Sequence, residues 1–297
     1  MTYREAVRET AGQLRAAGIE NETAESLFLL EFACGMERKD YLLSQMEEMP
    51  PEQWERYRAA AAKRCGHIPL QHLTGEQEFM GLPFTVNRHV LIPRQDTEVL
   101  VEEALKILRS GWPQEQELQP DGQASGEAAQ EKLRVLDLCT GSGCIAVSLK
   151  ALCPQIQVSA ADLSAVALSV ARENAQRNHT EIHFVQSDLF ADISGCFQMI
   201  VSNPPYIPSR EIPALMPEVR EHEPLLALDG GADGLGFYRR IIAEGVGHLE
   251  SGGWLLFEIG YDQGEAVSAC MRAYGFTEIE VVRDLAGLDR VVKGRRK

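Results

Sequence analysis

Four consecutive residues, Asn203-Pro204-Pro205-Tyr206, combine groups that suit one kind of chemistry, and they directly follow an apolar run at 199–202. Asn203 contributes an amide oxygen, and Pro204 contributes a carbonyl with no competing N–H of its own. The two prolines stiffen the backbone, while Tyr206 offers a flat aromatic face. Such a tetrad can hold a planar NH2 group, because two acceptors fix its two N–H bonds while a ring packs against it.

An amide nitrogen held in this way gains reactivity. The free amide is a poor nucleophile because its lone pair is delocalised into the carbonyl. Acceptors outside the amide plane favour a more pyramidal nitrogen and hold it in line with an electrophilic methyl group, which lowers the barrier. No strong base is needed, since the methylated nitrogen is acidic and loses its proton late. The tetrad therefore indicates methyl transfer to an amide-type nitrogen. The competing interpretation is a proline-stiffened loop around a buried tyrosine.

A second candidate site is a glycine-rich loop between the apolar run at 135–138 and a helical pattern. The loop consists of Cys139, Thr140, Gly141, Ser142 and Gly143. Glycines let a backbone approach a ligand closely, and together with Ala146 they also satisfy a dinucleotide fingerprint. Asp162 ends the next apolar run, where a carboxylate can accept hydrogen bonds from ribose hydroxyls. NAD and S-adenosylmethionine both carry that ribose, so these residues predict a nucleotide without separating the two. A tight turn with a helix cap at Asp162 or Ser164 remains the alternative.

The elements that position both sites follow from hydrophobic patterning. From residue 134 on, apolar strand-like runs alternate with amphipathic helical patterns; the runs are 135–138, 157–161, 182–185, 199–202 and 255–259. That alternation indicates an α/β fold, a parallel sheet with helices on both faces. Two last runs, 277–282 and 290–292, are predicted to pair antiparallel at a sheet edge. Ligands of such sheets bind beyond the carboxyl ends of the strands, where a fourth strand can lie beside the first.

The first part of the chain has a different pattern. Residues 3–65 show helical spacing of apolar side chains, with breaks at glycines and at Pro50-Pro51. Extended pieces at 79–86 and 90–92, joined by 87–89, predict a β-hairpin. Helical spacing returns over 96–108. Residues 110–131 are rich in Gln, Glu, Gly and Pro and are expected to form a flexible surface insertion.

The composition excludes some classes of function. The 297 residues carry a formal net charge of -15, which disfavours a protein that grips a phosphate backbone with clustered Lys and Arg. The seven cysteines include no Cys-x-x-Cys pair and no histidine at metal-ligand spacing beside them, so we predict reduced thiols and no metal site. No apolar run approaches the roughly 20 residues that span a bilayer. We expect a monomeric cytoplasmic protein that binds neither nucleic acid nor membrane directly.

With these motifs in view, the chain resembles the release factor glutamine methyltransferases of the HemK/PrmC type over nearly its whole length. The stretches that carry the resemblance are 69–75, 90–98, the glycine loop, the tetrad, 223–235, and 257–260 with Gln263. The tetrad alone is shared with adenine and cytosine DNA methyltransferases, whereas 90–98 and 223–235 are more particular to this family. The sequence departs from the family pattern at Cys139, where glycine is usual, at Gln95, where proline is usual, and at Leu189, where some members have an aromatic residue.

The resemblance implies an activity: transfer of a methyl group from S-adenosylmethionine, leaving S-adenosylhomocysteine, to the side-chain amide nitrogen of the glutamine in the Gly-Gly-Gln loop of class I peptide-chain release factors. It implies that Cys139 to Gly143 wrap the methionine part of the cofactor and that Asp162 holds its ribose. Asp188 and Leu189 would border the adenine.

The resemblance also assigns the acceptor side. Asn203 and Tyr206 would hold the glutamine, with the Pro204 carbonyl as second acceptor, Pro205 beside them, and Asn203 also bordering the cofactor. Apart from the resemblance, Glu258 could assist catalysis, but an ordinary strand-end carboxylate is the favoured interpretation.

The implied architecture is a Rossmann-like class I methyltransferase domain with a seven-stranded, mostly parallel sheet, preceded by a small helical domain. The domains would be a helical substrate-recognition domain over 1–76, a linking β-hairpin over 77–95, and the methyltransferase domain over 96–297. Three alternatives stay open on the sequence: a DNA or RNA N-methyltransferase, an NAD-dependent dehydrogenase, and a non-catalytic cofactor-binding scaffold of the translation machinery.

Overall fold

The computed structural model of the chain describes residues 1–110 and 132–297, which divide into two compact units. The first unit comprises Met1–Glu76 and Ala214–Glu223, and the second comprises Gln77–Pro213 and Pro224–Lys297. Apart from Ser110, the predicted insertion at 110–131 lies outside the described residues. No helix within the two described ranges is long and apolar enough to cross a membrane.

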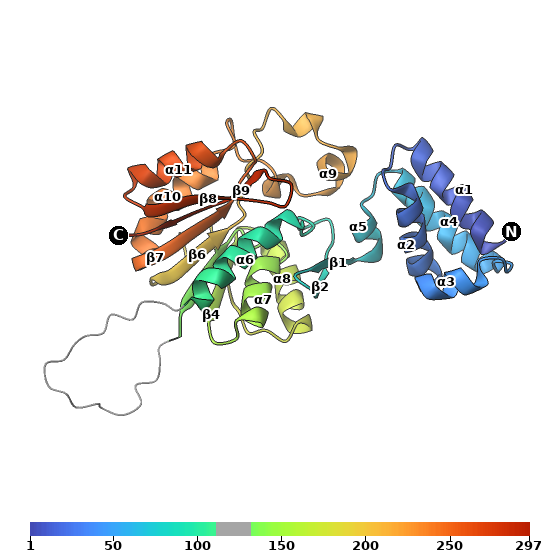
Figure 1. Cartoon of the computed structure of the whole chain (residues 1–297), viewed down its shortest axis with the longest axis horizontal. Helices are drawn as coiled ribbons and strands as arrows, with labels where there is room; N and C mark the ends of the chain where they lie inside the picture. Colours follow the sequence, from blue (N-terminus) through green and yellow to red (C-terminus); the bar gives the residue numbers. More distant parts are fainter. Residues whose placement is uncertain (111–131) are drawn as a thin grey trace, which may run out of the picture. The chain divides into compact units, whose positions relative to one another are not determined.

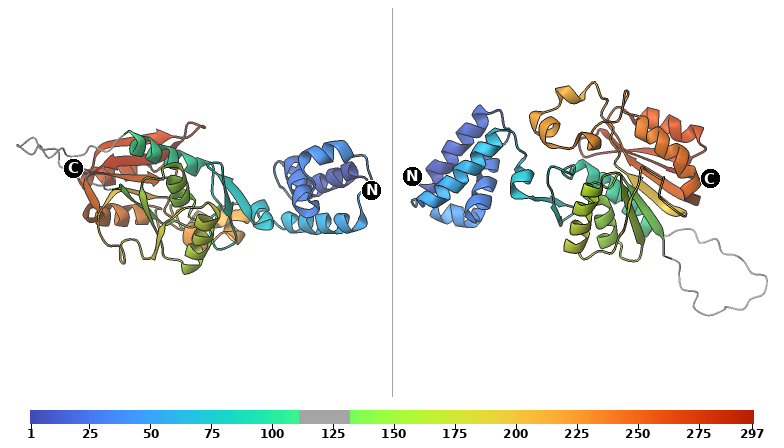
Figure 2. Two further views of the ribbon diagram at one scale, coloured as in Figure 1. Left: turned by 90° about the horizontal axis from the view of Figure 1, so that it is seen from below. Right: turned by 180° about the vertical axis from the view of Figure 1, so that it is seen from behind.

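The first unit is helical. Its helices are α1 (Tyr3–Ala16), α2 (Glu22–Cys34), α3 (Arg38–Ser44), α4 (Pro51–Cys65), α5 (Leu70–Thr74) and, from the later segment, α9 (Pro217–His222). Helices α1, α2 and α4, in blue in Figure 2, pack around a core that includes Leu14, Leu29 and Tyr57. Gly35, in the left-handed conformation, ends α2, and Pro51 occupies the first turn of α4. The prediction of helices over 3–65 is confirmed.

A buried arginine joins the two segments of this unit. The Arg64 guanidinium is 4% exposed and forms ion pairs with Glu25 at 2.5 Å and with Glu218 at 2.8 Å. Glu25 lies on α2, whereas Glu218 lies on α9. Because removing one partner of a buried charge leaves that charge uncompensated, both carboxylates stabilise the packing of α4 in this unit.

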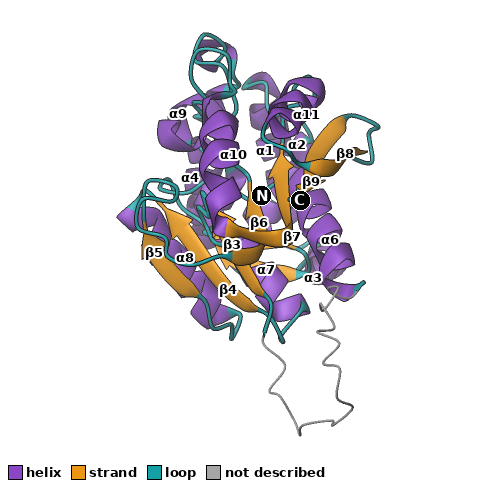
Figure 3. Ribbon diagram, turned by 90° about the vertical axis from the view of Figure 1, so that its left-hand side faces the viewer, coloured by secondary structure: helices purple, strands orange, loops and turns teal. Residues whose placement is uncertain are grey.

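The second unit is built on one sheet. Its strands are β3 (Arg134–Leu138), β4 (Gln157–Asp162), β5 (His183–Gln186), β6 (Phe197–Ser202), β7 (Leu249–Glu258), β8 (Thr277–Arg283) and β9 (Asp289–Arg295). Among the described residues they form a seven-stranded sheet in the order β5-β4-β3-β6-β7-β9-β8, drawn in orange in Figure 3. All neighbours are parallel except β9, which is antiparallel to β7 and to β8. The predicted mostly parallel α/β fold and its antiparallel edge pair are confirmed.

Helices cover both faces of this sheet (Figure 1). One face carries α6 (Asp96–Arg109), α7 (Cys144–Leu152) and α8 (Ala165–Arg177), and the other carries α10 (Gly236–His248) and α11 (Gly264–Ala273). Successive side chains of a strand point to opposite faces. Accordingly Val135 belongs to the core under α6 and α7, whereas the next residue, Leu136, belongs to the core under α10 and α11.

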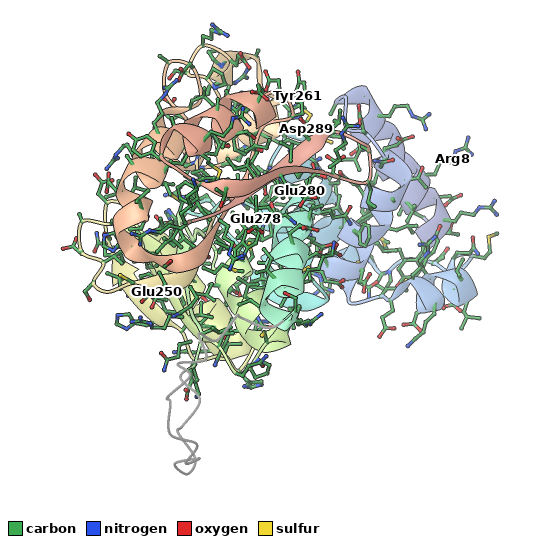
Figure 4. All side chains as sticks on the ribbon, turned by 60° about the vertical axis from the view of Figure 1, so that its left-hand side comes forward. Arg8, Glu250, Tyr261, Glu278, Glu280 and Asp289 are labelled. Carbon is green, nitrogen blue, oxygen red and sulfur yellow. The ribbon has the colours of Figure 1, made fainter. Side chains whose placement is uncertain are left out.

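Charged residues line the β8–β9 edge of the sheet, where Glu278, Glu280 and Asp289 are labelled in Figure 4. Their ion pairs are Glu278 with Arg295 at 3.0 Å, Glu280 with Lys293 at 3.0 Å, and Asp289 with Arg283 at 3.3 Å. Pairs at a solvent-exposed edge add about 1 kcal/mol or less each, but charges there discourage pairing with another chain.

The hairpin lies earlier in the chain than predicted. Strands β1 (Glu76–Phe79) and β2 (Leu82–Thr85) form a two-stranded sheet, and their turn is Met80-Gly81. A turn does form at 87–89, where the Val90 N–H donates to the Asn87 carbonyl at 3.2 Å, but residues 90–92 are not a strand. The predicted pairing of 79–86 with 90–92 is therefore wrong. In the hairpin that does form, the turn residues Met80 and Gly81 have positive φ, 53° and 74°, the geometry of two-residue turns that match the twist of the strands. A methionine does not signal that conformation in a sequence, so the pattern predicted one extended piece over 79–86 where the structure has a turn.

Candidate active site

A cleft opens at the carboxyl ends of β3, β4 and β6 in the second unit. Strand β3 lies between β4 and β6, so this is a point where the strand order switches direction. The register places Leu138 beside Ala161 on one side and beside Ser202 on the other. The residues that follow these three positions are therefore brought together: the glycine loop, Asp162 and the tetrad.

The predicted site residues divide into two groups by position. Those that line the cleft are Cys139, Gly141, Asp162, Asp188, Leu189, Asn203 and Pro205. Those that do not line it are Thr140, Ser142, Gly143, Pro204 and Tyr206. The wall also contains side chains that sequence reasoning did not assign to the site, among them His89, Val90, Leu91, Pro224, Leu226, Ala227 and Phe237. Most of these are apolar, so the cleft pairs an apolar wall with a few polar groups, as small-molecule sites generally do.

A buried carboxylate holds the glycine loop. Asp137, at the end of β3, is fully buried and accepts hydrogen bonds from the Thr140 hydroxyl at 2.5 Å and the Ala146 N–H at 3.2 Å. Burial raises the pKa of Asp137 to about 7, although both hydrogen bonds lower it. Gly143, with φ at 80°, leaves no room for a side chain, since a Cβ there would stand 3.0 Å from that of Ala171. Thr140 and Gly143 thus shape the loop from outside the cleft.

Two non-glycine residues of the cleft have a left-handed backbone. Cys139 has φ at 59° and Leu189 has φ at 52°, a conformation that costs an L-residue about 1–2 kcal/mol. The departure from glycine at Cys139 therefore falls where glycine would be unstrained. Strain of this kind gathers at ligand sites, where the surrounding structure enforces it.

Asp162 is the carboxylate of the cleft wall. Its Oδ2 accepts the Gly141 N–H at 2.9 Å, and its Oδ1 accepts the Ser164 N–H at 2.8 Å. Burial raises the pKa of Asp162, while these backbone donors lower it. Each carboxylate oxygen has two lone pairs, so both can still accept a hydroxyl. The Ser164 side chain caps α8 through the Ala167 N–H, and Asp162 links that helix start to the glycine loop.

The adenine-side candidates are fixed by neighbouring contacts. Asp188 pairs with Arg240 at 2.9 Å in a half-exposed ion pair. Leu189 is 5% exposed, and its carbonyl accepts the Ser187 hydroxyl at 2.8 Å. The Leu189 side chain thus adds to the apolar wall, beside a carboxylate that solvent can reach.

Side chains from distant elements hold the tetrad. The Asn203 Nδ2 donates to the Thr97 hydroxyl oxygen at 3.3 Å, and the Tyr206 hydroxyl donates to Glu258 Oε1 at 3.4 Å. Burial raises the pKa of Glu258 to about 7, although the nearby Thr97 hydroxyl lowers it. Burial likewise raises the pKa of Tyr206.

Sequence reasoning missed Thr97 and interpreted Glu258 as an ordinary strand-end residue. The available signal was that Glu258 is a charged residue within the apolar run 255–259, the next such run after the tetrad. A carboxylate there falls at the same edge of the sheet as the cleft.

The loop that follows α9 supports the tetrad through its glycines. A Cβ at Gly230 would stand 2.7 Å from the Tyr206 Cα, and a Cβ at Gly234 would overlap the Tyr206 carbonyl oxygen. Gln263 completes the support, because its Nε2 donates to that same carbonyl at 2.9 Å while its Oε1 accepts the Gly260 N–H at 3.0 Å. Gly230, Gly234 and Gln263 therefore share one physical role, which is close packing against the tetrad backbone.

Comparison with known proteins gives two family matches and many relatives. The model of the PrmC N-terminal domain matches residues 5–75, and that of the methyltransferase small domain matches residues 126–218. The chain is 40% identical to the release factor glutamine methyltransferase of Geobacter sulfurreducens, over 99% of this chain and 96% of that one. It is 41% identical to that of Moorella thermoacetica, over 100% and 99%. For that of Deinococcus radiodurans the identity is 39%, over 100% and 99%.

Among solved structures, the chain finds likeness at the level of the fold. The hMettl16 catalytic domain, solved with a 3'UTR hairpin, aligns with a TM-score of 0.54 over 79% of this chain and 81% of that one. The identity is 15%, so this likeness concerns the fold alone.

Proposed function

The chain belongs to the family of release factor glutamine methyltransferases, and from this premise we propose that it transfers a methyl group from S-adenosylmethionine to the side-chain amide nitrogen of a release factor glutamine. The glutamine is that of the Gly-Gly-Gln loop in class I release factors, and the products are N5-methylglutamine and S-adenosylhomocysteine. The observation that carries the proposal is that Asp162 and Asn203, a ribose-type acceptor and an amide-type acceptor, line one cleft.

The cleft residues fit the cofactor. Asp162 is a largely buried carboxylate that keeps acceptor capacity toward the cleft, and the pKa rise that burial causes favours pairing with hydroxyl donors. We assign the loop from Cys139 to Gly143 to the methionine part, Asp162 to the ribose, and Asp188 with Leu189 to the adenine. When bound, S-adenosylmethionine supplies an electrophilic methyl group.

The tetrad receives the acceptor amide. The Asn203 oxygen and the Pro204 carbonyl accept its two N–H bonds, and the Tyr206 ring packs against its plane, with Pro205 keeping the backbone rigid. The geometry of these groups is fixed before substrate binds, since Glu258 and Gln263 already hold Tyr206. Such preorganisation reduces the entropy that must be lost to reach the transition state.

The remaining assignments belong to the same proposal. Residues 1–76 recognise the release factor, residues 77–95 link the two parts, and residues 96–297 carry the methyltransferase site. Support comes from the two family matches, which separate residues 5–75 from 126–218. Because release factors act in the cytoplasm, we place the chain there, as a monomer that contacts the factor and not a nucleic acid.

A reciprocal pair of variants tests the proposal. Asn203→Ala should lower release factor methylation by about a hundredfold or more, because a positioned polar group is lost, while cofactor affinity changes little. Asp162→Ala should instead weaken cofactor binding by about 1–3 kcal/mol, because a charged acceptor is lost. Mass spectrometry of the Gly-Gly-Gln peptide measures the first effect, and calorimetry measures the second.

Two results would contradict these assignments. An unmodified release factor beside a nucleic acid methylated by the intact chain would replace the proposed substrate with DNA or RNA. An Asp162→Ala variant with intact cofactor affinity would limit Asp162 to linking the glycine loop and the start of α8.

A further inference from the structure

Helix α8 contacts three parts of the second unit that build the cofactor cleft. It begins beside Asp162, whose carboxylate accepts the Ser164 N–H at 2.8 Å. In its middle it packs closely on the glycine loop, since a Cβ at Gly143 would stand 3.0 Å from that of Ala171. Strand β2 of the hairpin lies along the same helix (Figure 1). One side chain of α8, Asn174, meets both the glycine loop and the hairpin, and it lies three residues after Ala171 on the same side of the helix.

The Asn174 amide uses both of its N–H groups and its oxygen. The Nδ2 donates to the Ser142 carbonyl at 2.9 Å and to the Thr85 carbonyl at 3.0 Å. The Oδ1 accepts the Thr85 N–H at 2.6 Å. Only the oxygen end can meet that N–H and only the nitrogen end can meet the two carbonyls, so the direction of the amide is fixed. Asn174 is 0% exposed, and it joins the backbone of the hairpin to the backbone of the glycine loop.

The hairpin matters to the cleft because of the segment that follows it. Residues 89–91 line the cleft, whereas β2 itself does not. Val86 and Val90 are nearly fully buried and belong to one apolar cluster. The other members of that cluster are Ala167 and Val170 of α8. Hydrogen bonds therefore hold the end of β2 on the helix, apolar packing holds the residues after it, and the wall at 89–91 depends on both.

We propose that Asn174 is a positioning residue that links the hairpin to the glycine loop and thereby sets the 89–91 wall of the cofactor cleft. The inference rests on the proposed function, because S-adenosylmethionine is the ligand assigned to this cleft. A link of this kind is reciprocal: cofactor binding orders the hairpin, and a loosened hairpin weakens cofactor binding by the same factor. The hairpin begins at Glu76, where the first segment of the helical unit ends, so cofactor occupancy reaches the part of the chain that continues from that unit.

Two asparagines of α8 provide a matched pair of variants of the full chain. Asn174→Ala leaves the buried carbonyls of Ser142 and Thr85 without this donor, so S-adenosylmethionine affinity should fall about tenfold in calorimetry. Turnover at saturating cofactor should change less. Asn178 donates to the Pro83 carbonyl of β2 at 2.9 Å and, within the helix, to the Asn174 carbonyl at 3.0 Å. Asn178→Ala therefore removes one contact with the hairpin and keeps the link to the glycine loop, and cofactor affinity should stay within about twofold of the wild type.

Hydrogen exchange measures the link without relying on catalysis. In the wild type, saturating S-adenosylmethionine should slow exchange of the β2 amides about tenfold, the factor that reciprocity requires. Because β2 does not line the cleft, direct shielding by the cofactor does not account for this protection. The protection should persist in Asn178→Ala and be lost in Asn174→Ala. A purely structural role for Asn174 would lower the free energy of unfolding but leave the cofactor-dependent protection of β2 intact.

The outcomes separate this inference from the proposed function. A wild type that binds S-adenosylmethionine but leaves the release factor unmodified contradicts the proposed function, while calorimetry and exchange still decide the role of Asn174. If the cofactor binds and β2 exchange in the wild type is unchanged, or if the two alanine variants bind with equal affinity, the positioning role is overturned. Urea unfolding reports whether each variant is folded, and if Asn174→Ala is not, the wild-type exchange result decides alone. A wild type that does not bind S-adenosylmethionine overturns both.

Discussion

The two sides of the cleft are held in different ways. On the cofactor side, Asp137 accepts from residues three and nine positions away in the chain, Thr140 and Ala146. On the acceptor side, Asn203 contacts a residue 106 positions away and Tyr206 contacts one 52 positions away. The glycine loop is therefore held by partners no more than 32 positions away, the farthest being Asp162 for Gly141 at 21 and Asn174 for Ser142 at 32, whereas the tetrad depends on the packing of α6, β7 and the 223–235 stretch. It follows that mutation can damage one side and spare the other.

The largest effect is expected where the tetrad backbone is packed most closely. Gly234→Ala places a Cβ against the Tyr206 carbonyl and 2.8 Å from Gln263 Nε2, so the tetrad must move. A displacement of about 1 Å in a reacting group can cost about a hundredfold in rate, and we expect a loss of turnover on that scale with cofactor affinity largely kept.

Gly231→Ala is the matched control for that variant. Gly231 also has positive φ, 88°, but a Cβ there meets nothing within 4 Å. Only the backbone strain of about 1 kcal/mol should remain, visible in the urea unfolding midpoint. Equal losses of turnover in the two alanine variants would show that strain, and not contact with the tetrad, is responsible.

An intermediate effect is expected on the cofactor side. Asp137→Asn keeps the shape of the side chain and one oxygen for the two donors that reach Oδ2, but a neutral amide oxygen is a weaker acceptor than a carboxylate. The glycine loop should therefore loosen, and cofactor affinity should fall about tenfold in calorimetry. Turnover at saturating cofactor should change less. If Asp137→Asn lost turnover at unchanged cofactor affinity, mutation would not separate the cofactor side of the cleft from the acceptor side.

The same variant should alter the pH dependence of stability. Burial raises the folded-state pKa of Asp137 from its ordinary 3.8 to about 7, so the folded chain holds this proton more tightly than the unfolded chain. The resulting stability is present at low pH and is lost as pH rises through about 7. The Asp137→Asn variant has no carboxyl group at this position, so its stability should not fall in this way as pH rises. Urea unfolding at several pH values between 3.8 and about 7 should show a free energy of unfolding that varies less with pH in the variant than in the wild type. Equal slopes would mean that a group other than Asp137 binds the proton.

The smallest effect is expected at Cys139. Cys139→Gly relieves left-handed strain of about 1–2 kcal/mol, offset by about 0.4–1 kcal/mol from the greater freedom of glycine in the unfolded chain. We expect a net stabilisation of about 1 kcal/mol or less in urea unfolding. The reverse change, Gly141→Ala, places a side chain at φ 54° in open space and should destabilise by a similar amount. A destabilised Cys139→Gly would mean that the thiol contributes packing that outweighs the strain.

This contrast also explains what the sequence could predict. The glycine loop was found because Asp137 to Ala146 form one contiguous pattern, and the strands were found because alternating apolar runs reflect burial on the two faces of a sheet. The tetrad was found for the same reason, since its four residues are adjacent. Its supports were not found, because Thr97 and Glu258 become neighbours of the tetrad only through strand order and helix packing.

Local backbone conformation was a second feature that the sequence could not predict. Met80 has the left-handed backbone of a two-residue turn, a conformation usually signalled by glycine or asparagine, and its position in an apolar run predicted a strand instead. Helices α5 and α9, of five and six residues, are too short for a helical period to be visible. Nor does any pattern in residues 214–223 predict that they join the helical unit.

That membership determines where the chain can be divided. A fragment ending at Glu76 would keep Arg64 and Glu25 but lose Glu218, so a guanidinium that is 4% exposed would keep only one of its two carboxylates. Conversely, a fragment beginning at Asp96 would carry α9 without the arginine that binds it. The helical unit is therefore not a transplantable module with a single boundary. An exchange of helical units between homologues should therefore move residues 1–76 and 214–223 together. If only residues 1–76 are moved, the receiving chain must already carry a carboxylate that can pair with the transferred arginine.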